Sequence, residues 1–246
     1  MSGHSKWSTI KHKKGAKDAQ RGKLFAKLAR AVEVAAREGG GDPDANATLA
    51  QAVAKAKAAS MPNDNIDRAI KRGAGEIGGA AYEEVWYEGY GPGGVAVFVQ
   101  VLTDNRNRAA SDVRTAFSRA GGNLGEPGSV AYLFSQCGYL LAAGDEDAIL
   151  LASLDAGAED VRPGDGEHEV ICPPGLLFQV QAAMEEAGIE VRAAEVTWLP
   201  STTIRLDEAG ARAVLRLVDA LEDLDDVQTV FANFDISDEV MAAVAG

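Results

Sequence analysis

The stretch GVAVFVQVLTDNRNRAASDVRTAFSRAGG, residues 94–122, decides the fold. Its first nine residues are mostly apolar and β-branched, which predicts a buried strand. After a short polar loop, Val113, Ala116 and Phe117 recur at helical spacing, and Gly121 ends the pattern. A buried strand that passes through a polar loop into a helix predicts an α/β domain.

The chain on either side extends this domain. A further strand is predicted over SVAYLFS, residues 129–135. After Pro200 a strand, a helix and a strand follow, and the last strand, VQTVFANFDI, is expected to complete the sheet begun at Gly94. The segment between them shows a β-α-β-α-β series that suits a ferredoxin-like sandwich. The predicted division is therefore an α/β domain of residues 81–134 plus 200–246, with an inserted ferredoxin-like domain of residues 135–199.

The first 80 residues have a different texture and predict a helical bundle. A helix fits residues 17–38, because five apolar residues fall within one sector of the helix: Leu24, Phe25, Leu28, Val32 and Ala35. An alanine-rich helix over 45–59 and a short helix ending at Gly73 follow, and a glycine-rich linker closes the region. The fold class is thus α+β and multi-domain, with a three-helix bundle before two α/β sandwich domains.

Charge is divided unevenly along the chain. The 246 residues carry a formal net charge of −13. Residues 1–75 hold 15 basic and 7 acidic residues, a net of +8, whereas the remainder holds 9 basic and 30 acidic residues, a net of −21. This asymmetry indicates two regions that face different partners.

The positive charge is concentrated in an amino-terminal basic arm. Seven cations and one acid lie between Lys6 and Lys23, with Trp7 among them. Such cations can follow a phosphate backbone, and an aromatic side chain can stack on a base. A solvated charged face is the plainer alternative, but the density of cations favours nucleic-acid binding. The predicted nucleic-acid contacts are Lys6, Trp7, Lys11, His12, Lys13, Lys14, Lys17, Arg21, Lys23, Lys27, Arg30, Arg68, Lys71 and Arg72.

A second candidate contact is the loop TDNRNRAASD, which lies between a strand and a helix amino terminus. Backbone N–H groups at that position favour anions. A plain helix cap with two surface arginines explains the loop equally well, and both interpretations stay open. The residues of this candidate are Asn105, Arg106, Asn107 and Arg108.

Enzymatic chemistry lacks its usual residues. GYGPGG fits G-x-G-x-x-G, but a strand follows it where a dinucleotide fold needs a helix, so a turn between strands is predicted. Cys137, Cys172 and the three scattered histidines lack metal-site spacing. The acidic cluster at residues 222–226 could hold Mg²⁺, but a solvated helix end is favoured. We therefore expect no enzyme, no cofactor and no metal.

The compartment expected from the sequence is the cytoplasm. No apolar run is long enough to cross a membrane, and the start of the chain lacks the apolar core of a secretory signal. The arm is rich in lysine and broken by glycines, unlike a transit peptide. The two cysteines are expected to be reduced thiols.

Long motifs give the sequence a close, full-length resemblance to the YebC/PmpR family, which includes the mitochondrial translational activator of cytochrome oxidase. They are GHSKWSTIKHKKGAKDAQRGKLFAKL, MPNDNIDRAIKRG, YEGYGPGGVAVFVQVLTDNRNRAASDVR, GGNLGEPGSVAYLF and LEDLDDVQTVFANFDI. The resemblance implies three domains, the third inserted in the second, and no catalysis or cofactor. It also implies either DNA-binding transcriptional regulation or a role in translation through difficult sequences such as proline runs. The segment SQCGYLLAAG departs from the family pattern by lacking an expected lysine.

Three functions remain open from the sequence. The first is a duplex-DNA-binding transcriptional regulator, and the second is a factor that binds ribosomal RNA or the ribosome. The third is a protein-interaction scaffold in which the acidic domains bind a protein partner and the arm is incidental. No membrane partner is expected.

Overall fold

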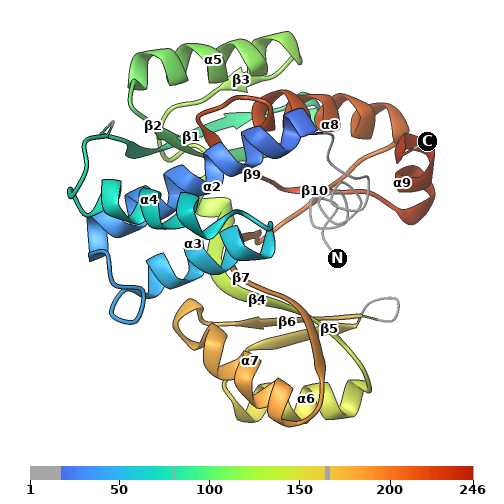
Figure 1. The fold of residues 1–246 in the computed structure, drawn as a ribbon. Coiled ribbons are helices and arrows are strands. Elements are labelled where there is room, and N and C mark those ends of the chain that lie inside the picture. Colours follow the sequence, from blue (N-terminus) through green and yellow to red (C-terminus); the bar gives the residue numbers. More distant parts are fainter. Residues whose placement is uncertain (1–17, 80, 164–166, 246) are drawn as a thin grey trace.

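The structure, a computed structural model, describes residues 18–79, 81–163 and 167–245, and forms three units (Figure 1). The helical unit comes first and leads into the central unit. The chain enters the inserted unit at Phe134 and returns to the central unit after Pro200. The α+β class with a helical amino-terminal region is confirmed. No helix in the described ranges combines the length and the apolar character that a membrane span requires.

The helical unit packs around the longest helix. Its helices are α2 (Asp18–Gly39), α3 (Ala47–Ala58) and α4 (Asn63–Gly73). Val32, Leu49 and Ile66 are buried between them. The prediction that Leu24 faces this core is wrong, since its side chain is 41% exposed. α3 and α4 span 12 and 11 residues against 22 in α2, so they are too short to cover the whole of α2.

Two residues set how these helices meet. Asn46 caps α3 by accepting from the Leu49 amide, and its side-chain amide donates to the carbonyls of Ala35 and Gly40, each at 2.8 Å. Gly73 ends α4 against α2, where a Cβ would lie 2.2 Å from the carbonyl oxygen of Glu33. Only glycine permits this approach between the two helices.

The central unit is an antiparallel sheet covered by helices on one face. Its sheet has the order β3-β1-β2-β9, and α5 and α8 lie on the covered face. Along β2, alternate residues such as Val99 pack against the helices, and Phe98 points to the opposite face. The bounds are β1 (Glu83–Tyr90), β2 (Ala96–Thr103), α5 (Arg106–Arg119), β3 (Asn123–Leu124), α8 (Glu208–Glu222) and β9 (Val227–Ala232).

The GYGPGG segment forms the last two residues of β1 and most of the turn to β2, which confirms the prediction of a turn between strands in place of a dinucleotide loop. It contains the short 3-10 helix Pro92–Gly94. Gly93 and Gly94 have φ angles of +72° and +78°, a left-handed conformation that favours glycine. The glycines here serve the backbone of a hairpin.

The carboxyl-terminal strands only partly follow the prediction. β9 joins the sheet beside β2, as expected. The predicted strand 227–236 is broken at Asn233, whose side chain accepts from the Ala96 amide at 2.7 Å. Beyond the break, β10 (Phe234–Asp235) pairs in parallel with β8 (Ile204–Arg205), outside the main sheet. A last helix, α9 (Asp238–Ala245), was not predicted.

The inserted unit has the ferredoxin-like arrangement. Its sheet has the order β5-β6-β4-β7, with all pairs antiparallel, and both helices pack against it. β5 was not predicted from the sequence, and it spans only four residues. The bounds are β4 (Phe134–Ala143), α6 (Glu146–Asp155), β5 (Asp160–Pro163), β6 (His168–Cys172), the 3-10 helix Pro174–Leu176, α7 (Leu177–Glu186) and β7 (Glu190–Pro200).

The predicted strand over residues 129–135 is wrong for residues 129–133, which form a bend followed by the 3-10 helix Ala131–Leu133. The reason is Glu88 on β1, a buried carboxylate. It accepts from the amides of Gly128, Val130 and Ala131 at 2.6–2.7 Å. Those N–H groups bond to a carboxylate, so they are not used in a strand ladder.

We expect Glu88→Gln to lower the free energy of unfolding by about 2 kcal/mol, because one acceptor oxygen becomes a donor facing backbone N–H groups. Burial raises the pKa of Glu88, but the three backbone N–H groups outweigh it, so the pKa lies below its usual 4.5. The folded-state pKa is depressed, so this stability is present above the usual pKa and lost as the pH falls through the folded value. Urea unfolding at pH 7 and pH 4 measures both effects. The matched control is Glu126→Gln, an exposed acid of the same loop, which should change little.

Aromatic packing joins the central and inserted units. Trp86 of β1 stacks on Phe98 with ring centroids 4.3 Å apart, and Trp198 of β7 meets Phe98 edge-on at 5.4 Å. The helical unit approaches the inserted unit across a cleft of about 810 Å³ lined by α3, β7 and α7. The Lys55–Glu195 ion pair, 2.8 Å long, links α3 to β7 at this cleft.

Candidate nucleic-acid interface

The predicted contacts divide into three groups by where they lie in the structure. The first group lies outside the described residues and comprises Lys6, Trp7, Lys11, His12, Lys13, Lys14 and Lys17. The second group is engaged with acidic or main-chain oxygens of the same chain. The third group is exposed on the helical unit.

The engaged group begins on α2, where Lys23, Lys27 and Arg30 recur at helical spacing on one face. This face lies against the end of α8 and the loop that follows it. Lys27 Nζ donates to the Glu222 carbonyl at 2.6 Å, and Lys23 Nζ lies 3.7 Å from the carboxylates of Asp223 and Asp225. These three cations were predicted to contact nucleic acid, and in the structure they lie between two units of the chain.

Burial shifts the pKa of one of these lysines, Lys27. Desolvation lowers the pKa of Lys27 from 10.5 to about 8. The nearby charge of Glu222 opposes this shift and Lys23 adds to it. Lys27 is therefore held in a site where its charge is costly.

Asp226 joins the two predicted contact regions. Its carboxylate lies 3.3 Å from Arg30 Nη1 and 2.7 Å from Arg108 Nη2, and it accepts from Thr103 Oγ1 at 2.9 Å. The Asp226 residue is 8% exposed. The expectation that the acidic cluster at residues 222–226 is a solvated helix end is therefore wrong for Asp226, which is a buried ion-pair partner of two units.

The loop before α5 has the features of a cap. Asn105 is the N-cap and accepts from the Arg108 amide at 3.1 Å, and Arg106 pairs with Glu83 at 3.4 Å. Arg108 also bonds Asp104 at 2.7 Å, and its hydrogen bonds to Asp226 and then Asp104 raise its pKa. Asn107 is exposed. The cap interpretation accounts for Asn105, and both arginines are paired within the chain.

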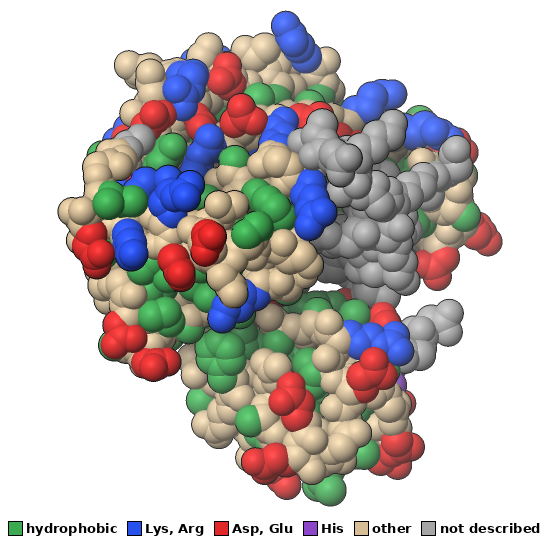
Figure 2. Space-filling model, viewed as in Figure 1, with side chains coloured by type: hydrophobic (Ala, Val, Ile, Leu, Met, Phe, Trp, Pro, Cys, Tyr) green, Lys and Arg blue, Asp and Glu red, His purple; other side chains and the backbone are tan. Residues whose placement is uncertain are grey.

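The third group lies on the outer surface of the helical unit. Arg68 and Lys71 of α4 are exposed, as is Arg21 of α2. Lys57 of α3, which is outside the predicted set, is exposed as well. Within the described residues, no acidic oxygen lies within 4 Å of the side-chain nitrogens of Arg68, Lys71 or Lys57. Figure 2 shows Lys and Arg side chains over the helical unit, with Asp and Glu side chains among them, whereas most charged side chains visible on the inserted unit are Asp and Glu.

Arg72, the remaining member of the predicted set, faces inward. It bonds the carboxylate of Glu33 at 2.9 Å, and Arg37 bonds the same carboxylate at 3.1 Å. Glu33 is only 2% exposed, so Arg72 neutralises a buried charge between α2 and α4. The only sign of this ion pair in the sequence was a single acid, Glu33, within the apolar run of α2.

Two residues that shape the surface were not among the predicted contacts. Lys57 extends the exposed cations onto α3, and its only signal was its position outside the apolar pattern. Tyr82 supports Arg30, whose guanidinium lies 5.3 Å from the centre of the tyrosine ring. Over the ranges that the structure describes, no group of three or more His, Cys, Asp or Glu residues is placed to hold a metal ion.

The fold and the charge together define a class of protein. It is a multi-domain α+β chain in which a basic helical domain precedes two acidic α/β domains, one inserted in the other.

Comparison with known proteins gives the family. Residues 5–76 match the model of the TACO1/YebC protein N-terminal domain, and residues 82–234 match the TACO1/YebC second and third domain. The chain therefore belongs to the TACO1/YebC family.

Relatives match over essentially the whole chain. A protein of Rubrobacter xylanophilus is 61% identical over 251 residues, covering 100% of both chains, and one of Beutenbergia cavernae is 60% identical over 247 residues, covering 98% of both. Both are named "Probable transcriptional regulatory protein". The crystal structure of a conserved hypothetical protein from Aquifex aeolicus has a TM-score of 0.81 at 48% identity, covering 93% of this chain and 97% of that one.

Proposed function

We propose that this protein is a nucleic-acid-binding regulator of gene expression in the cytoplasm, and that its basic arm and helical unit contact the phosphate backbone. The observation that carries the proposal is the separation of charge. Residues 1–75 carry a net charge of +8 and the rest carries −21. Such a molecule is attracted to a polyanion by one end and repelled at the other, which orients it on binding.

The exposed cations of the helical unit extend this surface beyond the arm. Arg68 and Lys71 lie on the same helix, three residues apart, and Lys57 adds a charge from α3. Because their side chains have no acidic partner within 4 Å among the described residues, phosphate would not have to displace one. The acidic units would face solvent or a protein partner. The proposal assigns no catalytic step and no cofactor.

DNA-binding transcriptional regulation is the first form of the proposal, in keeping with the names of the relatives. Binding to ribosomal RNA or to the ribosome during translation is the second. One feature favours this second form: α4 has only 11 residues, and Arg68 is its best-placed residue for contact with base edges. A surface of this kind suits recognition of shape and phosphate more than of sequence.

The test is the salt dependence of binding. We expect Arg68→Ala with Lys71→Ala to weaken binding to a fluorescent 20-base-pair duplex about tenfold or more at 0.1 M salt. The slope of log K against log salt should fall by about 2, because two phosphate contacts are lost. Replacing Lys11, Lys13, Lys14 and Lys23 by alanine should flatten the slope further. Anisotropy titrations over a range of salt concentrations measure both quantities.

The matched control for the α4 variant is Arg119→Ala with Arg216→Ala. It removes the same charge from exposed positions of the central unit. Equal loss in both double variants would show that only net charge matters and would contradict the interface. Crosslinking in cells, followed by sequencing of the bound nucleic acid, separates the two forms. Ribosomal RNA would reject the transcriptional form, and promoter DNA would reject the ribosomal one.

A further inference from the structure

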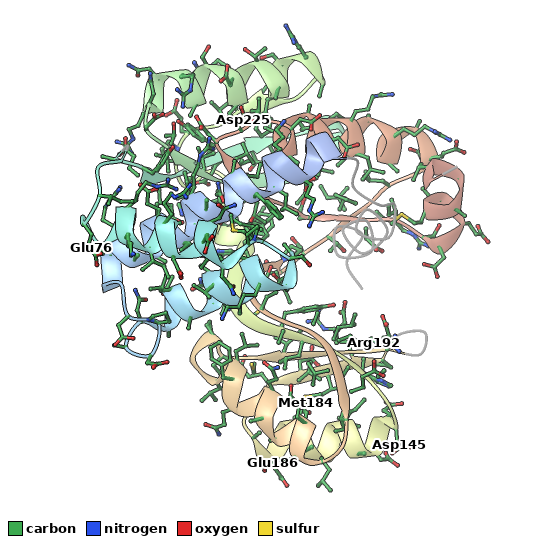
Figure 3. All side chains as sticks on the ribbon, viewed as in Figure 1. Glu76, Asp145, Met184, Glu186, Arg192 and Asp225 are labelled. Atoms are coloured by element: carbon green, nitrogen blue, oxygen red, sulfur yellow. The ribbon has the colours of Figure 1, made fainter. Side chains whose placement is uncertain are left out.

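The carboxyl-terminal end of α8 is stabilised by cations of another unit. The last carbonyl groups of a helix lack partners within the helix and carry partial negative charge. α8 has no basic residue in its own last turn. The carbonyls of Glu222 and Asp223 accept instead from Lys27 and Lys23 of α2, which lies across the unit boundary. Figure 3 shows Asp225, in the loop after α8, close to α2 and α8.

This loop presents α2 with a row of oxygens. From Glu222 to Asp226 it offers both main-chain carbonyls and carboxylates to the three cations of the α2 face. Arg30 donates to the Asp225 carbonyl and pairs with Asp226 at 3.3 Å. Anionic oxygens at successive positions of a chain are also what a phosphate backbone offers to lysine and arginine. The loop and a nucleic acid would therefore be ligands for the same face.

We propose that residues 222–226, the end of α8 and the α8–β9 loop, are an internal competitor that occupies Lys23 until a nucleic acid displaces it. This inference rests on the proposed function. In the free protein Lys23 binds the loop; in the complex it binds phosphate. The loop thus lowers the affinity of the intact protein and selects ligands with enough charge to displace it.

The strengths of the contacts determine which of them exchange. The side chains of Asp223 and Asp225 are 84% and 75% exposed, and their pairs with Lys23 are 3.7 Å long. Exposed pairs of this kind are weak and are screened by salt. Arg30 is only 18% exposed and its partner Asp226 is buried. Lys23 is therefore the exchanging cation. Lys27, which is desolvated and lies 2.6 Å from the Glu222 carbonyl, and Arg30 hold α2 on the central unit in both states.

The test compares two variants that remove the same charge. Asp223→Asn with Asp225→Asn weakens the competitor. Asp147→Asn with Glu186→Gln removes two exposed acids from α6 and α7 of the inserted unit. Figure 3 shows Glu186 at the end of this unit that lies away from α2. Against a fluorescent 20-base-pair duplex and an RNA hairpin at 0.1 M salt, the loop variant should bind at least fivefold more tightly than the control variant. In wild type, amide hydrogen exchange of residues 222–226 should accelerate when the nucleic acid is added.

The possible results distinguish failure of the competitor from failure of the proposed nucleic-acid-binding function. Equal affinity of the two variants, together with unchanged exchange in the loop while wild type binds, would overturn the competitor and leave the proposed function standing. Absence of binding by wild type and by both variants would overturn both. All the substituted positions are exposed, so the variants should fold, and thermal unfolding verifies this.

Discussion

Asp226→Ala is expected to lower the free energy of unfolding by about 4 kcal/mol, which is typical for the loss of one partner in a buried ion pair. The carboxylate is the shared partner of Arg30, Arg108 and Thr103. Its removal leaves the guanidinium of Arg30, 18% exposed, without an acidic partner. Urea unfolding followed by tryptophan fluorescence measures the loss, because Trp86 and Trp198 lie between the central and inserted units.

The adjacent residue supplies the control. Asp225 is 75% exposed, and its carboxylate makes only a 3.7 Å pair with Lys23, so Asp225→Ala should cost less than about 1 kcal/mol. Adding Arg30→Met to Asp226→Ala should recover part of the lost stability, since the unpaired charge is then removed as well. Equal effects of the two aspartate variants would mean that the Asp226 cluster does not hold the units together.

Local pattern predicted most of the elements. The helices over residues 18–39, 106–119 and 208–222 and the buried strand β2 follow from apolar spacing, and Val113 and Phe117 are buried as predicted. Spacing reports which face of an element is apolar, and in these elements that face is buried in a core. The prediction that Leu24 is buried is wrong because the spacing of apolar residues along α2 gives no information on the length of the neighbouring helices.

Contacts between distant parts of the chain were not predictable in this way. Glu88 accepts from amides about 40 residues further along, and the strand-like sequence at residues 129–133 forms a bend and a 3-10 helix there. Lys27 meets the Glu222 carbonyl, 195 residues away. A cation on the polar side of a helix gives the same pattern whether it faces water, phosphate or a second domain. The charge asymmetry was visible in the sequence, but the pairing of α2 with the acidic loop required the fold.

Lys27→Met is expected to stabilise the protein at pH 7 and to remove a pH dependence at alkaline pH. The folded-state pKa of Lys27 is about 8 against 10.5 ordinarily. Between these values the unfolded chain binds a proton that the folded chain does not, so the free energy of unfolding rises with pH. At about 1.4 kcal/mol per pH unit, the rise totals on the order of 3 kcal/mol. Methionine keeps the apolar stem in place and carries no charge to desolvate.

The measurement is the difference in unfolding free energy between Lys27→Met and wild type, followed from pH 7 to pH 11. Taking the difference cancels the contributions of groups that titrate in both proteins. Among them are Tyr87 and Cys137, whose pKa values are raised by burial. The advantage of the methionine variant should be largest below pH 8 and should shrink as the pH rises to 10.5. Lys57→Met, at an exposed position of α3, should show a flat difference. A flat difference for Lys27→Met as well would mean that water reaches the ammonium group and that α2 does not press it against α8.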